Sequence, residues 1–387
     1  MIYLDNAAST AVHPEVVKEM LPYFDTQYGN PSSIHQFGRK AKNAIQKARK
    51  QVAALIGAES DEIIFTSGGT ESNNTIFYGI KFQGEKFEPS HIITSSIEHD
   101  AVLEPIRELQ KSCPITYLPV DKHGMINPDD ITKSISEQTV MISIMFANNE
   151  VGTIQPIKEI SKICNKYQIP LHTDAVQAVG KIPINVKDLG VDALSISSHK
   201  INGPKGVGAL FLKKGSTTTP YILGGGQENG MRSGTENVAS IVGFGKACEI
   251  AKDKLSDNIS HFQTLHSSIL SKVVKEIPHV KLNGHPQNRI FNNIHLTFLG
   301  VNGEDLIIKL DEHGIAASTG SACSMHTQKA SHVLKAMGFN HEQITGSLRI
   351  SFGYTNTLDE VEQTVEVLKK VVAELRSISP YKTKYSF

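Results

Sequence analysis

The sequence predicts an α/β protein in which a mostly parallel β-sheet is flanked by helices and followed by a smaller α/β section. Two observations predict the sheet. From about residue 15 to residue 250, short apolar runs of strand length alternate with helix-like segments, which is the order typical of parallel sheets covered by helices. Most of these runs end at polar residues, and ligands of such sheets bind beyond the carboxyl ends of the strands. The 387 residues are enough for two domains.

Two helices are expected before the first strand. The segments PEVVKEMLPYF (14–24) and GRKAKNAIQKARKQVAALIG (38–57) carry apolar residues at helical spacing. The strands that follow are short apolar runs closed by turn or polar residues. They are Glu62–Thr66, His91–Ser95, Val140–Ala147, Pro170–Asp174, Ala193–Ser197 and Gly208–Leu212.

A long helical pattern from Ile241 to about Leu255 leads into the second section. The predicted boundary therefore lies near residue 255. Residues 14–255 would form a large domain, and residues 1–13 together with 256–387 would form a small domain.

The composition excludes several classes of function. Lys+Arg and Asp+Glu both number 39, so no basic nucleic-acid surface or polybasic membrane anchor is expected. The N-terminus MIYLDNAAST lacks the pattern of a signal peptide, and no run of about 18 apolar residues could span a membrane. Four cysteines without a CxxC pair fit a reduced compartment. We expect a cytoplasmic protein whose partner is a small molecule or another protein.

A lysine after a predicted strand is the first candidate for chemistry. Lys200 follows Ser197–His199 and precedes the Gly-rich run GPKGVG. A lysine in such a turn can be desolvated and can form a Schiff base. Pyridoxal phosphate (PLP) needs such a lysine, an acid partner for its ring nitrogen and a phosphate cradle. Taken alone, however, Lys200 would be read as a lysine of a surface loop.

Two further segments supply the missing parts. Asp174 ends the strand IPLHTD, where its carboxylate could face a ring nitrogen, although an isolated Asp there would be read as a helix N-cap. The segment SGGTESNN (67–74) joins a strand to a helix, and a helix N-terminus favours anions such as phosphate. The segment fits neither the P-loop nor the dinucleotide fingerprint.

These motifs, taken in order, resemble those of the NifS/IscS-type cysteine desulfurases, which belong to the class-V aminotransferase group of fold-type I PLP enzymes. The resemblance runs nearly from end to end. It rests on YLDNAAST (3–10), YGNPSSIHQFG (28–38), SGGTESNN, IEHDAV (97–102), ANNEVGTIQPI (147–157), HTDAVQAVGK (172–181), SSHKINGPKGVGAL (197–210), GGGQENGMRSGTENV (224–238), STGSACS (318–324) and SLRISFG (347–353).

The resemblance implies a role for each matching residue. Lys200 would form the Schiff base with PLP, Asp174 would pair with the pyridinium nitrogen, and His99 would stack on the ring and assist proton transfer. Asn149 and Gln177 would contact the ring hydroxyl, and the phosphate would be bound by Gly69, Thr70, Ser197 and His199. Thr235 would contact the phosphate of the neighbouring subunit of a homodimer. Arg349 would bind the substrate carboxylate, with Asn30 nearby.

The four cysteines differ in their sequence surroundings. Cys164 and Cys248 fall in line with apolar residues at helical spacing, and Cys113 precedes a proline at the start of a strand-like run. These three are expected to be structural. Cys323 lies in the polar, glycine-containing segment STGSACSMHTQKAS, where a thiol would be accessible. Without the lysine site, Cys323 would be read as an inert loop cysteine.

The resemblance implies that L-cysteine is converted to L-alanine and that the sulfur stays on Cys323 as a persulfide. The persulfide would serve an acceptor protein, such as an iron–sulfur scaffold or a tRNA-thiolation enzyme. The alternatives on the same fold are an aminotransferase, a selenocysteine lyase and a non-catalytic sulfur-relay protein. Only the desulfurase requires Cys323 together with L-cysteine. The histidines of HTQKASH (326–332) lack the ligand spacing of a metal site, so no metal is expected.

Overall fold

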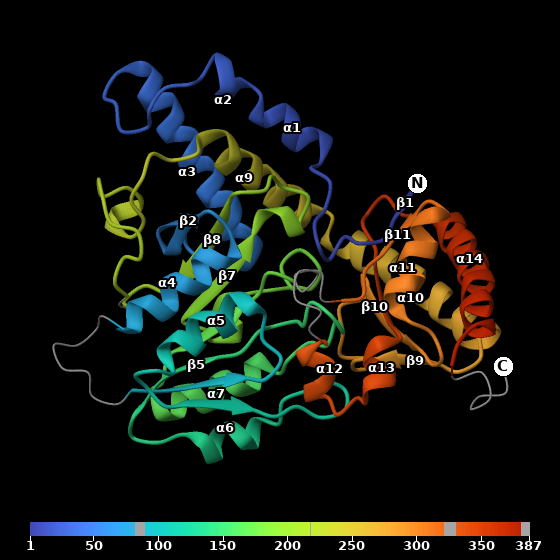
Figure 1. Cartoon of the computed structure of the whole chain (residues 1–387). Helices are drawn as coiled ribbons and strands as arrows, with labels where there is room; N and C mark the ends of the chain where they lie inside the picture. The colour runs from blue at the N-terminus through green and yellow to red at the C-terminus, as the bar shows by residue number, and fades with distance from the viewer. Residues whose placement is uncertain (82–89, 217, 321–329, 381–387) are drawn as a thin grey trace.

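The computed structural model describes residues 1–81, 90–216, 218–320 and 330–380. Figure 1 shows a larger part that carries a wide sheet and most of the N-terminal half of the chain, beside a smaller part that carries the C-terminal helices. Cys323 lies outside the described residues.

The wide sheet has seven strands, and it confirms the predicted α/β class with a mostly parallel sheet. Neighbouring strands from β7 to β4 are all parallel, whereas β8 is antiparallel to both of its neighbours. The order across the sheet is β2 (Ile63–Thr66), β8 (Gly208–Leu212), β7 (Ala193–Ser197), β6 (Leu171–Asp174), β5 (Thr139–Ser143), β3 (His91–Ser95) and β4 (Ile115–Leu118).

Two strand predictions differ from the structure. The predicted strand Val140–Ala147 ends early, because β5 stops at Ser143. The chain still follows β6 after that point, since the Ile144 and Phe146 amides donate to His172 and Asp174, but the pairing is no longer a regular ladder. The edge strand β4, which follows Cys113, was noted as a strand-like run but was not among the predicted strands of the sheet. Three of its four side chains are half-buried and only Leu118 is buried, so it lacks the full apolar run of the central strands.

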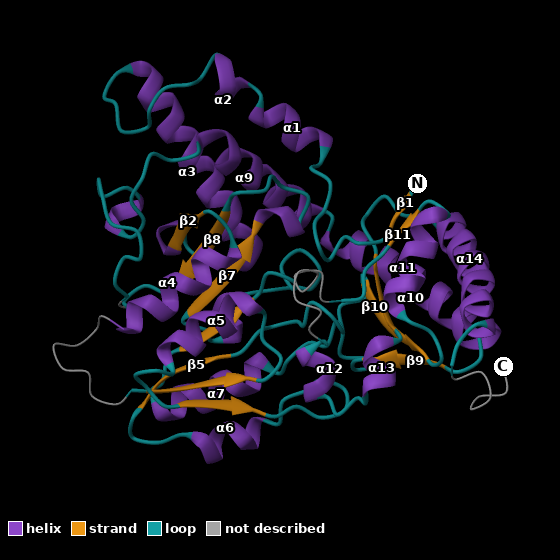
Figure 2. Cartoon of the chain, in the orientation of Figure 1, coloured by secondary structure: helices purple, strands orange, loops and turns teal. Residues whose placement is uncertain are grey.

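Helices cover both faces of this sheet (Figure 2). One face packs on α1 (Pro14–Met20), α3 (Gln36–Ile56), α6 (Pro128–Ser134), α7 (Ile157–Tyr167), α8 (Val186–Leu189) and α9 (Val238–Asp253). The other face packs on α4 (Gly69–Lys81) and α5 (Asp100–Leu109). In β2, Ile63 and Phe65 belong to the first core and Ile64 to the second, as the alternation of side chains along a strand requires.

The single helix predicted over residues 14–24 is wrong. The chain forms α1 and then a separate turn, α2 (Pro22–Asp25). Pro22 has no N–H to continue the hydrogen bonding of α1, and it takes the first position of α2, where that donor is not needed.

The smaller part contains an antiparallel sheet in the order β12 (Ser347–Ser351), β10 (Asn293–Phe298) and β9 (Val280–Asn283). Its helices are α10 (Leu255–Glu276), α11 (Gly303–Glu312), α12 (His332–Ala336), α13 (His341–Thr345) and α14 (Leu358–Ser377). The N-terminal β1 (Ile2–Tyr3) pairs with β11 (Ile315–Ala316), and Leu4 belongs to the core of this part. The division into domains at residue 255 stays a prediction.

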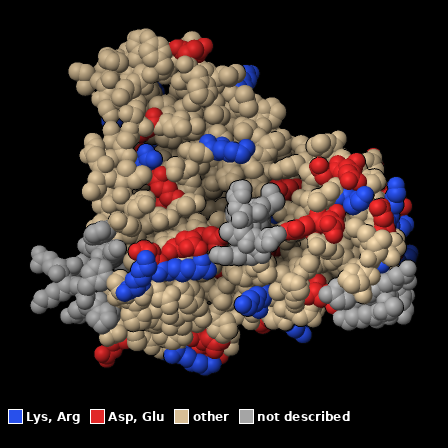
Figure 3. Space-filling model, viewed as in Figure 1, with Lys and Arg blue, Asp and Glu red and all other residues tan. Residues whose placement is uncertain are grey.

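The visible face of the molecule mixes acidic and basic side chains with a large uncharged area (Figure 3). None of the helices within the described ranges is long and apolar enough to cross a membrane.

Candidate active site

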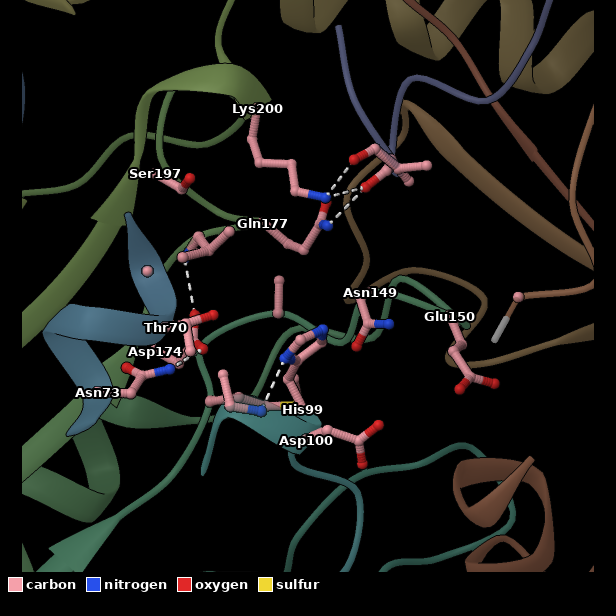
Figure 4. A pocket seen from close by; sticks show the side chains of 18 of the residues that line it. Thr70, Asn73, His99, Asp100, Asn149, Glu150, Asp174, Gln177, Ser197 and Lys200 are labelled. Atoms are coloured by element: carbon pink, nitrogen blue, oxygen red, sulfur yellow. Dashed lines mark hydrogen bonds between the residues drawn. The ribbon is translucent and has the colours of Figure 1, made fainter. Parts of the chain in front are cut away.

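A cavity of about 560 Å³ opens beyond the carboxyl ends of the parallel strands (Figure 4). Its wall combines residues that follow β3, β5, β6 and β7 with residues of the smaller part. Ten predicted site residues line it, namely Gly69, Thr70, His99, Asn149, Asp174, Gln177, Ser197, His199, Lys200 and Arg349. Gly69 and Arg349, which are 280 positions apart in the sequence, therefore line the same cavity.

Three predicted residues are not among those that line the cavity. Thr235 lines a separate cavity of about 200 Å³. Asn30 is exposed before α3, and its side-chain oxygen accepts a hydrogen bond from the Ser32 amide at 2.9 Å rather than lying near Arg349 in the wall. Cys323 is outside the described residues, but Gly320 and Ala330, which flank residues 321–329, do line the cavity.

Lys200 ends the short turn that follows β7, and its amine points into the cavity (Figure 4). Its Nζ donates to the backbone oxygens of Ala7 and Ala8 at 2.6 and 2.7 Å. The N-terminal segment thus holds the amine by two carbonyls. Lys200 is the lysine that the cavity presents to a ligand.

Asp174 ends β6 as the sequence predicted, and it is almost fully buried. Asn73 of α4 donates to its Oδ2 at 2.8 Å, and the Val176 amide donates to its Oδ1 at 3.0 Å. These two donors fix the orientation of the buried carboxylate. The carboxylate is therefore oriented and able to hold a protonated ring nitrogen.

The first turn of α4 is built to receive an anion. Gly69 and Thr70 open the helix at the wall of the cavity, where backbone N–H groups lack helical partners. A Cβ at position 69 would lie 2.7 Å from a methyl carbon of Val176, so the close approach requires glycine. Ser197 adds a hydroxyl at the same end of the cavity.

Two histidines of the site are held neutral. Burial is the main reason that the pKa of His99 is lowered, with Lys200 acting in the same direction and Asp174 against it. His99 also caps α5, because its Nδ1 accepts from the Ala101 amide at 3.0 Å. Burial and the nearby Lys200 lower the pKa of His199 to about 4. Because His99 Nδ1 accepts from a backbone amide, its neutral ring carries the hydrogen on Nε2, from which it can donate a proton.

An unused acceptor shows that the cavity fits a polar ring. Gln177 donates from Nε2 to the Ala7 oxygen at 3.0 Å, but its Oε1 is buried and has no partner among the described residues. Asn149 lies on the opposite side of the cavity (Figure 4). An amine, an oriented carboxylate, an anion-binding helix turn and an unpaired amide oxygen together match the donor set that PLP requires.

Arg349 of β12 closes the wall on the side of the smaller part. Its Nη2 donates to Asp5 Oδ1 at 2.9 Å, and its Nη1 donates to the oxygens of Asn149 and Gly320 at 3.0 and 2.9 Å. The planar guanidinium suits a substrate carboxylate. In this structure the guanidinium donates these hydrogen bonds to protein oxygens.

Sequence reasoning missed several supporting residues. Asn73 lies one helical turn after Gly69 and Thr70, so its place beside Asp174 could have been found from the spacing in SGGTESNN. The carbonyls of Ala7 and Ala8 had no such signal, because every residue has a carbonyl. Glu150, which is buried in the wall, was also missed.

Comparisons with known proteins show the family to which the chain belongs. The profile of the family Aminotransferase class-V matches residues 2–364. The cysteine desulfurase IscS of Dictyoglomus turgidum is 50% identical over 385 residues, which are 99% of this chain and 98% of that protein. The cysteine desulfurase IscS of Methanosarcina thermophila is 50% identical over 384 residues, covering 99% of this chain and 95% of that protein.

Solved structures are similar as well. A NifS-like protein superposes with a TM-score of 0.91 at 38% identity, covering 96% of this chain and 99% of its own. SspA in complex with cysteine superposes with a TM-score of 0.80 at 36% identity, covering 91% of this chain and 99% of its own. Both similarities extend over the larger and the smaller part of the chain.

Proposed function

The chain belongs to the class-V aminotransferase family and is a PLP-dependent cysteine desulfurase, and from this premise we propose that it transfers the sulfur of L-cysteine to Cys323 as a persulfide. One observation supports the proposal above the others. The amine of Lys200, the carboxylate of Asp174 and the imidazole of His99 share a cavity whose wall also contains Gly320 and Ala330, the residues that flank 321–329.

The protein's residues divide the work of the reaction. Lys200 would hold PLP covalently, Asp174 would keep its ring nitrogen protonated, and the first turn of α4 would bind its phosphate. When bound, PLP supplies an electron sink for the electrons left when the α-proton of L-cysteine is removed. Lys200 would accept and return that proton, His99 would assist the transfer as a donor through Nε2, and Arg349 would orient the substrate carboxylate.

The sulfur step needs no oxidant. The Cys323 thiolate attacks the substrate sulfur, so that a sulfur–sulfur bond forms while the bond between sulfur and the β-carbon breaks. The carbon fragment keeps the electron pair, takes up protons and leaves as L-alanine. The balance is one L-cysteine and one enzyme thiol for one L-alanine and one enzyme persulfide.

The direct test is the product balance. Purified holoenzyme given L-cysteine and a thiol reductant should release alanine and sulfide in equal amounts over many turnovers. Alanine is measured by amino-acid analysis and sulfide by a colorimetric assay. Formation of 3-mercaptopyruvate that depends on an added 2-oxo acid as amino acceptor, without alanine from L-cysteine, would indicate an aminotransferase. No reaction with L-cysteine would leave the sulfur-relay alternative.

We also propose that the active form is a homodimer in which Thr235 completes the phosphate site of the partner. Thr235 lies outside the cofactor cavity of its own chain. Leu223 and Ile34 are 80% and 91% exposed, so both apolar side chains are open to contact with a second subunit. The segments that carry them lie on the outer edge of the larger part, away from the smaller part (Figure 1).

Complementation tests the shared site. Thr235→Asp would place a negative charge against the partner's phosphate, so this variant and Lys200→Ala should each be inactive as homodimers. In a hybrid dimer one site combines an intact Lys200 with an intact Thr235. An equal mixture after subunit exchange should recover about a quarter of the wild-type rate, because half of the dimers are hybrids with one good site of two. No recovery, after exchange is verified by mass spectrometry, would argue against sharing.

The sulfur acceptor is a protein in this proposal. An iron–sulfur scaffold and a tRNA-thiolation enzyme both fit an exposed persulfide donor, and capture of the persulfidated enzyme's partner from the native host would distinguish them. The cytoplasmic location stays a prediction.

A further inference from the structure

The loop that carries Thr235 contains a buried ion pair that the proposed reaction does not use. Arg49 of α3 and Glu228 of the loop are 7% and 8% exposed. Arg49 Nη1 donates to Glu228 Oε2 and Arg49 Nη2 donates to Glu228 Oε1, both at 2.6 Å. Two parallel hydrogen bonds from a planar guanidinium fix the orientation of a carboxylate as well as its distance. Residue 228 is therefore fixed against α3.

The sheet holds the same carboxylate. The Phe65 amide of β2 donates to Glu228 Oε2 at 2.9 Å, and Arg49 Nη1 donates to the Ile63 oxygen of the same strand at 2.6 Å. The guanidinium carbon of Arg49 lies 4.8 Å from the centre of the Phe65 ring. A helix, a strand and the loop thus meet at Glu228.

The backbone at Glu228 has a conformation that needs such support. Glu228 and Asn229 have φ angles of +49° and +55°, and residues other than glycine seldom adopt this left-handed region. Strained backbone of this kind persists only where the surrounding contacts hold it. The ion pair and the Phe65 amide are contacts that do so.

The turn at Glu228 is joined to Thr235. Gln227 Oε1 accepts from the Gly234 amide at 2.8 Å, so the residue before Glu228 holds the residue before Thr235. Glu228 and Thr235 line the same cavity of about 200 Å³. On its other side, Thr235 is followed within three residues by the start of α9. The position of Thr235 therefore depends on the turn that Glu228 fixes.

We propose that Arg49 and Glu228 are a positioning pair for Thr235, and that they support the phosphate site of the partner subunit rather than that of their own chain. The inference rests on the proposed function, in which Thr235 completes the partner's phosphate site. Neither Arg49 nor Glu228 lines the cavity of its own chain that contains Lys200. A defect in the pair should therefore appear in the site of the neighbouring chain.

Cofactor binding gives the first readout. In the Glu228→Gln homodimer the affinity for PLP, titrated through its absorbance, should fall by about tenfold or more, as for the loss of one hydrogen bond to a charged group. Pyridoxal has the same ring and aldehyde but no phosphate, so its affinity should change by less than about twofold. Glu362→Gln, which removes an exposed carboxylate from α14, is the matched control and should bind both as wild type. Equal weakening for PLP and pyridoxal would overturn the inference, because Glu228 would then support the site as a whole.

Hybrid dimers give the second readout. In an equal mixture with Lys200→Ala, Glu228→Gln should recover about a quarter of the wild-type rate beyond the residual rate of its homodimers, because its own Lys200 then meets an intact Thr235 loop from the partner. Asp174→Asn is the control that acts in its own site, and it should recover nothing with Lys200→Ala. Glu228→Gln mixed with Thr235→Asp should also recover nothing, because neither site of that hybrid receives an intact loop.

A double variant keeps the test decisive if Glu228→Gln does not fold. Arg49→Met combined with Glu228→Leu removes both charges at similar volume, so that no unpaired charge stays buried. It should show the same loss of affinity for PLP but not for pyridoxal, and the same recovery with Lys200→Ala.

The outcomes are distinct. Unchanged PLP affinity in both variants would overturn the inference. So would a failure of both to recover activity with Lys200→Ala under conditions in which Thr235→Asp does recover it. If Thr235→Asp itself recovers nothing, the shared phosphate site of the proposed function fails, and the inference fails with it.

Discussion

The Lys200→Ala variant is expected to lose turnover of L-cysteine by at least about 10³-fold, because one side chain supplies both the covalent link to PLP and a proton acceptor. Its Nζ lies 2.6 and 2.7 Å from the Ala7 and Ala8 carbonyls, in the wall of the cavity that also presents Asp174. PLP should still bind through the first turn of α4 and Asp174, but only noncovalently. Gel filtration should then remove it from the variant and not from the wild type.

Borohydride reduction identifies the lysine. Treatment of the wild type should fix PLP on the peptide that contains Lys200. Two nearby lysines are the controls. Lys181 is buried, and burial lowers its pKa to about 7; it lines a second cavity, which Lys200 also borders, but not the cavity that contains Asp174 and His99. Lys205 follows in the same Gly-rich run. A label on either of them, or a Lys200→Ala variant with normal turnover, would refute the assignment.

The Cys323→Ser variant is expected to keep the absorbance of bound PLP and to release no sulfide from L-cysteine. A serine hydroxyl is a far weaker nucleophile than a thiolate and forms no persulfide. The three described cysteines cannot take over this step. Burial raises the pKa of Cys164 to about 12, and it raises the pKa values of Cys113 and Cys248 as well. A thiol whose pKa is raised by burial is less ionised at neutral pH than an ordinary cysteine, and it is a correspondingly weaker nucleophile.

Mass spectrometry gives the corresponding positive result. Wild-type enzyme incubated with L-cysteine should gain one sulfur atom on the peptide that contains Cys323, and alanine variants of the three buried cysteines should gain it there too. Sulfur on another cysteine, or sulfide release by Cys323→Ser, would show that the thiol is wrongly assigned. Loss of activity on L-cysteine with activity on selenocysteine retained would mean that only the sulfur step needs the thiol.

The sequence by itself determined which residues end the strands and which faces are apolar. Because the carboxyl ends of parallel strands share one edge, polar residues after β3, β5, β6 and β7 had to meet there, and His99, Asn149, Asp174 and Lys200 do line one cavity. Helical spacing likewise predicted that Cys164 and Cys248 are buried, and the structure confirms it. Both results depend on periodicities of a few residues, which a sequence displays directly.

The tertiary structure alone decided what surrounds those residues. The carbonyls that accept from Lys200 belong to Ala7 and Ala8, which are 193 and 192 residues away in the chain. The Ser331 hydroxyl that donates to Glu150 is 181 residues away from it. A backbone carbonyl is the same in every residue, and a serine in a polar segment gives no sign of its partner. Such contacts follow from how the smaller part and the N-terminal segment pack against the sheet, and that packing is set by apolar cores whose residues carry no chemical signal of the site.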